Sequence, residues 1–397
     1  NNLYTTKYKS YMSKIRLSKR EKNMRHGIVG SYLKLAAQDK NIISLGPGEP
    51  DFVTSKRVMN YGSKLLSKGY STHYSPPGGR ISLKNKIVED LSKNYKMNYN
   101  KNNIVVTSGS QEALMLGLIS TIDPNDEVIL PTPSYMGYIP TIQFLNGKVV
   151  ESPTFMKNKF DLNTEDLRKK ITKKTKGIIL CNPSNPTGMI YSKKMLEELS
   201  DLVIENDLFV MSDECYVDLI YDNNKFNSFS KLNGMKQHSI TLRSFSKSHA
   251  MCGFRVGYAV GPANIIKEMT ETHVNTTISA PTISQYMAEY ALDYGRSYTN
   301  RMLKEYDKRR KLIHSGLNKM GYSTLLPQGA FYVFPKIHSN NSEDYSKKIL
   351  SQSKIITIPG SEFGDAGEGH IRMSYATSRS NILSSINRLE KFNKKYI

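Results

Sequence analysis

Cysteine is scarce in this sequence, and long hydrophobic runs are missing from it. The three cysteines, Cys181, Cys215 and Cys252, are odd in number, far apart and without metal-site spacing, so the sequence indicates neither a disulfide framework nor a metal centre. Such sparse use favours a reducing compartment, and we expect a cytoplasmic protein. No apolar run approaches the roughly 18 residues that a membrane helix needs, so we expect no membrane association.

Acidic residues are also few relative to basic ones. Lys and Arg number 56 against 35 Asp and Glu, a formal net charge of +21, and basic residues are densest before position 26. One interpretation is attraction to nucleic acid or anionic membranes. The other is a solvated arm on a lysine-rich chain. Because no basic motif interleaved with aromatic residues accompanies the charge, we favour the solvated arm and expect no nucleic-acid partner.

The length and the order of apolar segments indicate an α/β protein. With 397 residues, 38% of them hydrophobic, the chain is long enough for two or three globular domains. Short apolar segments alternate with helical ones between positions 127 and 212, which predicts βαβ units and a mostly parallel sheet. Strands are expected at 127–130, 148–151, 177–181 and 208–212, and helices at 135–145, 164–171 and 193–205.

Polar residues follow several of these strands. Ligand sites in such sheets lie at the carboxyl ends of the strands, where the sequence places Tyr135, Asn182 to Gly188, and Asp213 to Tyr216. A long charged helix at 297–320, with shorter strand and helix segments after it, predicts a second domain of the α+β kind.

Lys247 stands in an unusual setting of small and hydroxylic residues. Ser244, Ser246 and Ser248 surround it, and Arg255 follows. Partial burial and a nearby cation lower the pKa of a lysine, and its neutral amine can then condense with a carbonyl. Serines and an arginine suit a phosphate, and an aldehyde that carries a phosphate is pyridoxal 5′-phosphate (PLP). Taken alone, the pattern fits equally well one surface lysine among many.

Two loops have features of a phosphate or carboxylate site. Gly46 to Phe52 holds two glycines and two prolines in seven residues, which fixes a loop that a ligand can approach closely. Ser108, Gly109 and Ser110 follow an expected strand and open a helix, where free N–H groups and the helix dipole bind phosphate. Each loop alone also fits an ordinary turn or helix cap.

Taken together, the motifs resemble the class I aminotransferases of PLP-dependent fold type I, over about positions 24 to 392. They occur in the family's order, and the chain looks like the archaeal-type aspartate/aromatic aminotransferases. The motifs are Gly48-Glu-Pro-Asp-Phe52, Asn185-Pro-Thr-Gly188, Ser212-Asp-Glu-Cys-Tyr216, Ser244-Phe-Ser-Lys247 with Gly253-Phe-Arg255, Gly329-Ala-Phe-Tyr332 and Arg372-Met-Ser-Tyr-Ala-Thr377.

The resemblance implies an architecture and a reaction. It implies a large PLP-binding domain at 46–295 with a mostly parallel seven-stranded sheet, and a smaller α+β domain at 296–397. Residues 1–45 would form an N-terminal arm and part of the small domain. The reaction would move an amino group from an L-amino acid (aromatic, aspartate or similar) to a 2-oxo acid such as 2-oxoglutarate.

The resemblance also implies a role for each candidate site residue. Lys247 would hold PLP as a Schiff base and transfer the proton, while Asp213 would keep the pyridine nitrogen protonated. Tyr74 would reach the phosphate of a neighbouring subunit, so the active sites of a homodimer would be shared. Tyr216 and Asn185 would bind the ring oxygen, Tyr135 would stack on the ring, Ser108, Gly109, Ser110, Gln111, Ser244, Ser246 and Arg255 would hold the phosphate, and Gly48, Asn185 and Arg372 the substrate.

Gln111 departs from the family pattern, because some aspartate-preferring relatives carry a lysine there. An amide supplies no charge, which favours aromatic or neutral donors over aspartate. Two alternatives stay open: a PLP-dependent lyase or synthase on the same scaffold, such as a carbon–sulfur β-lyase, and a non-catalytic PLP-sensing or nucleic-acid-binding protein. The complete set of Lys247, Asp213 and Arg372 favours an enzyme.

Overall fold

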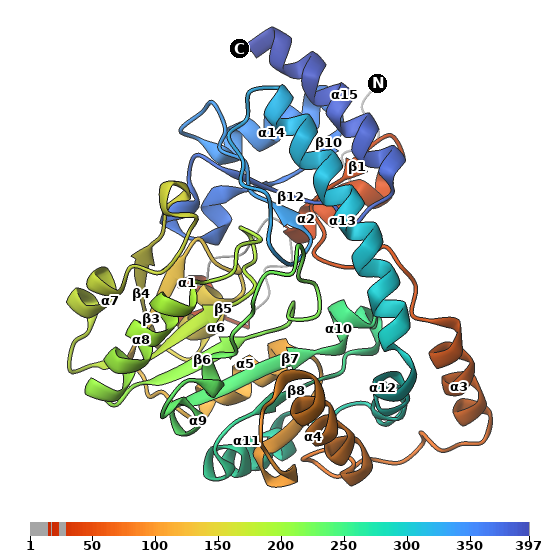
Figure 1. Ribbon diagram of the computed structural model, residues 1–397, viewed down its shortest axis with the longest axis vertical. Coiled ribbons are helices and arrows are strands. Elements are labelled where there is room, and N and C mark those ends of the chain that lie inside the picture. The colour runs from red at the N-terminus through yellow and green to blue at the C-terminus, as the bar shows by residue number, and fades with distance from the viewer. Residues whose placement is uncertain (1–14, 17, 24–28, 397) are drawn as a thin grey trace, which may run out of the picture.

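The computed structural model describes residues 15–16, 18–23 and 29–396 of the chain (Figure 1). Most of the basic segment before position 26 lies outside this part, so the solvated arm stays a prediction. Within it, no helix is both long enough and apolar enough to cross a membrane.

A seven-stranded sheet forms the centre of the larger part of the molecule. The strand order is β2-β8-β7-β6-β5-β3-β4, and every neighbouring pair is parallel except the two pairs that involve β8. The expected mostly parallel seven-stranded sheet is therefore confirmed. The strands are β2 Ile104–Thr107, β3 Glu127–Thr132, β4 Lys148–Pro153, β5 Thr175–Cys181, β6 Phe209–Asp213, β7 Ser239–Ser244 and β8 Gly257–Val260.

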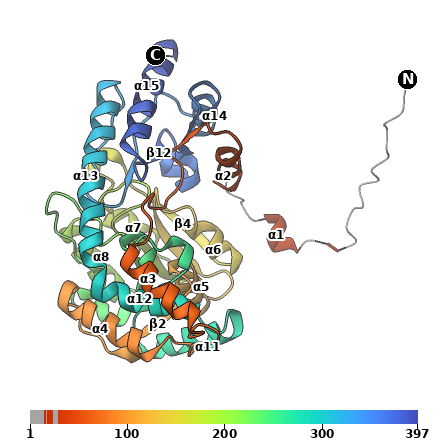
Figure 2. The ribbon, with the colours of Figure 1, turned by 90° about the vertical axis from the view of Figure 1, so that its right-hand side faces the viewer.

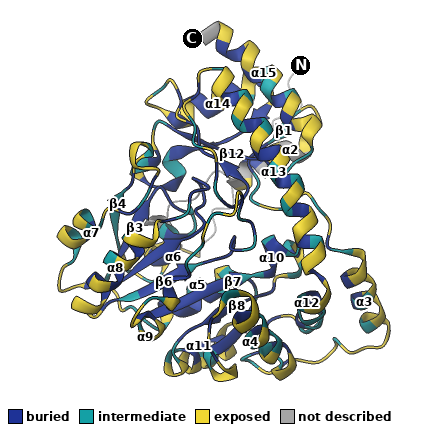
Figure 3. Ribbon diagram, viewed as in Figure 1, coloured by how far each residue is buried: buried dark blue, intermediate teal, exposed yellow. Residues whose placement is uncertain are grey.

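Helices cover both faces of this sheet, because successive strand side chains point to opposite sides. Ile178 and Leu180 of β5 belong to the apolar cluster beneath α7 and α8, whereas Ile179 belongs to the cluster beneath α5 and α11. The sheet is accordingly buried while the outer faces of the helices are exposed (Figure 3). These helices are α5 Ser110–Ile119, α7 Thr164–Lys170, α8 Lys193–Glu205 and α11 Ala263–Thr276.

Three further helices pack beside β2 and β8. α3 (Lys56–Ser67), α4 (Ile81–Tyr95) and α12 (Thr282–Tyr294) contribute to one apolar cluster with these strands, in which Leu83, Ile87 and Met287 are buried. Shorter helices connect the main elements. They are α1 Lys19–Asn23, α2 Val29–Gln38, α6 Tyr138–Phe144, α9 Met235–His238 and α10 Phe245–Ser248, and the 3₁₀ turns Lys101–Asn103, Met156–Asn158, Phe229–Lys231, Cys252–Phe254, Gly360–Phe363 and Asp365–Gly367.

The C-terminal part of the chain lies above the carboxyl ends of the central strands. α13 (Arg296–Lys319) runs from the sheet-containing part toward it in both views (Figures 1 and 2). Two small sheets and two helices complete it, as expected for an α+β arrangement. These are β9 Tyr332–Val333, β11 Ile358–Pro359 and β12 Ile371–Ser374, antiparallel; β1 Ile43–Ser44 and β10 Ile355–Ile356, parallel; and α14 Ser342–Ser353 and α15 Arg379–Tyr396.

The pairing of β1 with β10 joins the segment after α2 to the C-terminal part of the chain. Residues 43 and 44 thus lie beside the C-terminal part, while the assignment of residues 1–45 to an arm and part of the smaller domain stays a prediction. The domain boundaries near 45 and 295 stay predictions.

Candidate active site

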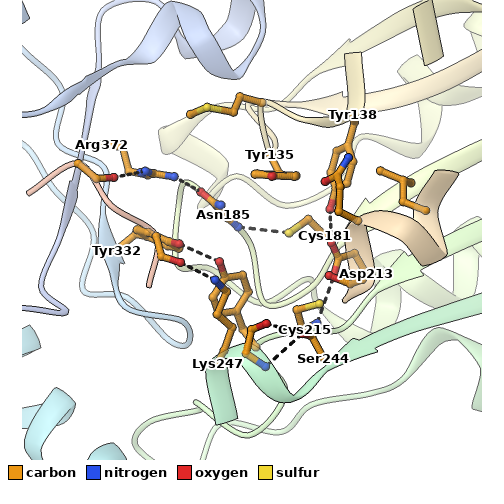
Figure 4. Close-up of a pocket in the computed structure, with 18 of the residues that line it drawn as sticks. Tyr135, Tyr138, Cys181, Asn185, Asp213, Cys215, Ser244, Lys247, Tyr332 and Arg372 are labelled. Atoms are coloured by element: carbon orange, nitrogen blue, oxygen red, sulfur yellow. Dashed lines mark hydrogen bonds between the residues drawn. The ribbon is translucent and has the colours of Figure 1, made fainter. Parts of the chain in front are cut away.

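A cavity at the carboxyl ends of the central strands collects most of the predicted site residues (Figure 4). Its volume is about 270 Å³. Ser108, Gly109 and Tyr74 are the predicted site residues that do not line it. The lining residues are Gly46, Gly48, Ser110, Gln111, Leu114, Tyr135, Met136, Tyr138, Cys181, Asn185, Asp213, Cys215, Tyr216, Ser244, Ser246, Lys247, Arg255, Tyr332 and Arg372.

Lys247 lies on α10, a single helical turn between the buried strands β7 and β8. Ser244 caps this turn by accepting a hydrogen bond from the Ser246 N–H, at 3.1 Å. The Lys247 amine donates to the Gly48 carbonyl at 2.5 Å and lies 3.9 Å from Cys252 Sγ. A short capped turn thus holds the amine in the cavity.

Asp213 is the last residue of β6 and presents its carboxylate to the cavity (Figure 4). The Tyr138 hydroxyl donates to one carboxylate oxygen at 2.7 Å, and the Cys215 N–H donates to the other at 3.1 Å. Burial, followed by the charge of Asp213, raises the pKa of the Cys181 thiol to about 12 and the pKa of the Cys215 thiol well above its ordinary value. Asp213 is therefore fixed by two donors beside neutral thiols.

Serine hydroxyls and one guanidinium form a cradle at the start of α5. Gly109 has φ +83°, and a Cβ there would lie 2.6 Å from an Arg255 nitrogen, so this position requires glycine. Arg255 donates to the Ser108 carbonyl at 3.3 Å, and the hydroxyls of Ser244 and Ser246 are 2.9 Å apart. The cradle is positive and rich in hydroxyl groups, and it faces the N-terminus of a ten-residue helix.

Glu112 supports this cradle through a hydrogen bond with the backbone of Ser108. Its carboxylate accepts the Ser108 N–H at 2.5 Å and the Thr277 hydroxyl at 2.7 Å, and lies 3.1 Å from His273 Nε2. Burial raises the pKa of Glu112, but hydrogen bonds from His273, Ser108 and Thr277 outweigh this effect and lower the pKa to about 2. The carboxylate therefore stays ionised at neutral pH and fixes the turn at Ser108.

Arg372, on β12, brings a buried cation from the C-terminal part into the cavity. Its guanidinium donates to Asn185 Oδ1 at 2.9 Å and to the Gly46 carbonyl at 2.5 Å, while its Nε is buried without a partner. No carboxylate pairs with Arg372 in the described part of the chain. A buried cation with only neutral acceptors and a free N–H is suited to bind an anion.

Aromatic residues close the remaining sides of the cavity. The Tyr216 and Tyr332 hydroxyls are 2.8 Å apart, and the Tyr332 ring lies 4.5 Å from the guanidinium carbon of Arg372. Tyr135 lines the cavity and packs edge-to-face on Tyr138, with the ring centres 5.3 Å apart. Neither Tyr138 nor Tyr332 was predicted to be a site residue. The sequence placed Tyr138 in a helix expected at 135–145, and Tyr332 at the end of the motif that begins at Gly329.

Several cavity residues were therefore missed by reasoning from the sequence. Cys181 was detectable, because it ends a predicted strand next to the one that ends at Asp213. Leu114 was detectable too, because it lies one helical turn after Ser110. Tyr138 and Met136 gave no local signal. Tyr74, in contrast, lies outside the cavity and is 79% exposed in the single chain.

The sequence model of the family described as aminotransferase class I and II matches residues 40–389. The chain belongs to this family. It is 41% identical over 362 residues to an aspartate aminotransferase of Pyrococcus abyssi, covering 90% of this chain and 93% of the relative. It is 38% identical over 366 residues to aromatic-amino-acid aminotransferase 2 of Thermococcus litoralis, covering 91% and 94%. The structure of an aspartate aminotransferase from Thermus thermophilus with maleate is similar, with a TM-score of 0.90 and 31% identity, covering 95% and 99%.

This aminotransferase is thus a PLP-dependent transaminase of fold type I, acting on an amino acid and a 2-oxo acid. The relatives support amino-group transfer, and nothing in them supports the lyase alternative. The cavity fits the cofactor on its own geometry. The glycine-dependent cradle at Gly109 and Arg255 has the chemistry of a phosphate site, and the Lys247 amine suits an aldehyde.

Proposed function

We propose that Lys247 binds the PLP aldehyde and moves the proton in transamination, with Asp213 and Tyr216 as its catalytic partners. The observation that carries this proposal is the convergence of the Lys247 amine, the Asp213 carboxylate and the Arg372 guanidinium on one cavity. These three groups come from α10, β6 and β12, which are far apart in the chain. A cation for a carboxylate, an amine for a carbonyl and a fixed carboxylate are the groups that the reaction needs.

PLP, when bound, supplies an aldehyde that accepts the amino group and a pyridine ring that draws electron density from the substrate Cα. Asp213 would pair with the ring nitrogen in this proposal, and the donors Tyr138 and Cys215 hold its carboxylate in place. The remaining site residues bind and orient. Ser108, Gly109, Ser110, Gln111, Ser244, Ser246 and Arg255 hold the phosphate, Tyr216 and Asn185 the ring oxygen, Tyr135 the ring face, and Gly48, Asn185 and Arg372 the substrate carboxylate.

The Lys247 amine is placed to move a proton. It donates a hydrogen bond to the Gly48 carbonyl. The carbonyl of Gly46, in the same loop, accepts a hydrogen bond from Arg372. A substrate carboxylate on Arg372 would bring the substrate Cα close to this amine, and general acid–base catalysis depends on such proximity. In this role, Lys247 Nζ would hold the proton that leaves the substrate Cα during the transfer.

For the substrate, we infer that aromatic amino acids are donors at least as good as aspartate, with 2-oxoglutarate accepted. Lys247, Arg255 and Arg372 are the cations among the described lining residues, and each already has a role. Gln111 donates from Nε2 to the Thr141 hydroxyl at 3.1 Å and brings no charge. Tyr135, Met136 and Leu114 add apolar surface. The named relatives include both aspartate and aromatic aminotransferases, which supports this range.

We also propose a homodimer with shared active sites, located in the cytoplasm. Tyr74 is 79% exposed on a loop away from its own cavity, and is therefore free to reach the phosphate of a second copy. All three cysteines are unpaired, which suits a reducing compartment. If the site is shared, Tyr74→Phe and Lys247→Ala proteins should partly restore each other's activity when mixed and re-associated. A fully active monomer would contradict the proposal.

The test of the function is a panel of amino donors with 2-oxoglutarate, followed through keto-acid formation. The wild type should be yellow and active. Lys247→Ala should lose transamination by several orders of magnitude, while a matched change at an exposed lysine, Lys194→Ala, should not affect it. Near-wild-type turnover in the Lys247→Ala protein would overturn the assignment.

A further inference from the structure

Tyr332 connects three parts of the active site without an assigned role of its own. Its side chain is fully buried, and its hydroxyl lies 2.8 Å from the Tyr216 hydroxyl. Gly48 approaches so closely that any side chain there would collide with this hydroxyl. The ring of Tyr332 lies under the Arg372 guanidinium, 4.5 Å from its central carbon. Figure 4 shows the Tyr332 side chain between Arg372 and Lys247.

The number of protons decides the direction of the bond between the two phenols. Each phenol carries one proton and can also accept, so the pair uses one proton between its members and must direct the other elsewhere. Tyr216 is the one hydrogen-bond partner of the Tyr332 hydroxyl among the residues that the structure describes. Both phenols line the cavity, but Tyr332 has no exposed surface, whereas Tyr216 keeps 6% exposure, so Tyr216 is the one with room to direct its proton away from the pair. The pair satisfies both protons when Tyr332 donates to Tyr216 and Tyr216 donates into the cavity.

We propose that Tyr332 is a positioning residue whose hydroxyl donates to Tyr216 and thereby strengthens the hydrogen bond that Tyr216 donates to the cofactor. This inference rests on the proposed function, in which Tyr216 binds the phenolic oxygen of PLP. Chains of hydrogen bonds polarise one another, so a phenol that accepts a bond is a better donor. The Arg372 cation over the Tyr332 ring acts in the same direction, because it draws electron density from the ring.

The sign of the effect follows from which form of the cofactor is stabilised. A donor at the phenolic oxygen stabilises negative charge there, and so lowers the pKa at which the bound cofactor loses its proton. Removal of the Tyr216 hydroxyl should raise this pKa by about 1 to 2, because hydrogen bonds to charged groups are worth roughly that much. Removal of the Tyr332 hydroxyl should raise it by about 0.1 to 0.6, since one bond strengthens the next by about 10–30%.

The experiment is a pH titration of the visible absorbance of the purified holoenzyme. The proteins are the wild type, Tyr216→Phe, Tyr332→Phe and the double variant Tyr216→Phe/Tyr332→Phe. Because Tyr332 acts through Tyr216, the double variant should titrate at the same pH as Tyr216→Phe alone. The matched control is Tyr345→Phe, which breaks a similar buried bond to Tyr322 (2.7 Å) outside the cavity and should leave the midpoint unchanged.

Each outcome bears on the proposal. An unchanged midpoint in Tyr332→Phe, or a shift that adds to that of Tyr216→Phe, overturns the relay while leaving the proposed function intact. A wild type without a pH-dependent visible band overturns both. If Tyr332→Phe does not fold, a fluorinated tyrosine at position 332 keeps the bond as a stronger donor and should lower the midpoint. A rise or no change with the fluorinated residue would overturn the relay.

Discussion

Replacement of Arg372 by lysine tests the substrate site most directly, because it keeps the charge and removes the shape. Arg372 is 3% exposed, and its two terminal nitrogens donate in different directions, to Asn185 and to Gly46. Its Nε is free. This arrangement lets the planar guanidinium offer a carboxylate two parallel N–H groups, which a lysine ammonium cannot reproduce.

The magnitude follows from the number of bonds. Hydrogen bonds to charged groups are worth roughly 1.5–3 kcal/mol each, and Arg372→Lys retains about one of two. The loss of about 1.5–3 kcal/mol corresponds to a decrease in kcat/KM of roughly 10- to 150-fold. The acceptors on Asn185 and Gly46 also lose a donor, which acts in the same direction.

The assay is kcat/KM for phenylalanine and for aspartate, each with 2-oxoglutarate. Every amino acid carries the α-carboxylate, so both values should fall by the same factor while the visible absorbance of the bound cofactor persists. A matched control is Arg388→Lys, since Arg388 donates to backbone carbonyls such as Asn41, away from the cavity, and should tolerate the change. A loss below about threefold, or one confined to a single donor, would refute the role of Arg372.

Three further predictions follow from the same structure. Asp213→Asn should lower kcat by about 10² or more, as for other electrostatic groups that act in the transition state, and an unchanged kcat would contradict its role. Gln111→Lys should raise the ratio of kcat/KM for aspartate over phenylalanine by about tenfold, or about 1.4 kcal/mol, because the added cation can pair with the second carboxylate of aspartate. A strong preference of the wild type for aspartate would contradict this, because it would mean that an unidentified cation already binds that carboxylate. Hydrogen bonds from Arg379 and Arg309 lower the pKa of Glu305 to about 2, against the opposing effect of partial burial. The ionised form thus stabilises the fold above the unfolded pKa near 4.5 and ceases to do so as the pH falls through about 2. Glu305→Gln should therefore lower the urea midpoint at pH 5 by more than at pH 2, and an equal effect at both would contradict this.

The sequence was most informative about the candidate site where the chain brings its residues together locally. The alternation of strands and helices was enough to place Asp213 at the end of a strand, which is β6. Ser244 ends β7, the parallel neighbour of β6, so the two residues lie at one edge of the sheet. The phosphate turn and α10 are also local, because Gly109 and Lys247 each lie within a few residues of the hydroxyls beside them.

The sequence did not predict contacts that depend on distant segments. Tyr138 reaches Asp213 over 75 residues, and Tyr216 reaches Tyr332 over 116. Such pairs depend on how whole elements pack, which no local period or motif encodes. The reversed strand β8 is another example, because its place between β2 and β7 follows from long-range pairing.

The contacts of Arg372 explain why the site requires both parts of the molecule. β12 supplies the cation, the loop after β5 supplies Asn185, and the loop after β1 supplies Gly46, so three distant segments meet at one guanidinium. Neutral oxygens hold Arg372 in place but do not neutralise it. A substrate carboxylate offers charged acceptors, which bind a guanidinium about twice as strongly as neutral ones do. The buried charge is therefore oriented in advance. In the proposed role of Arg372, a substrate would replace weaker contacts by stronger ones instead of first ordering the arginine.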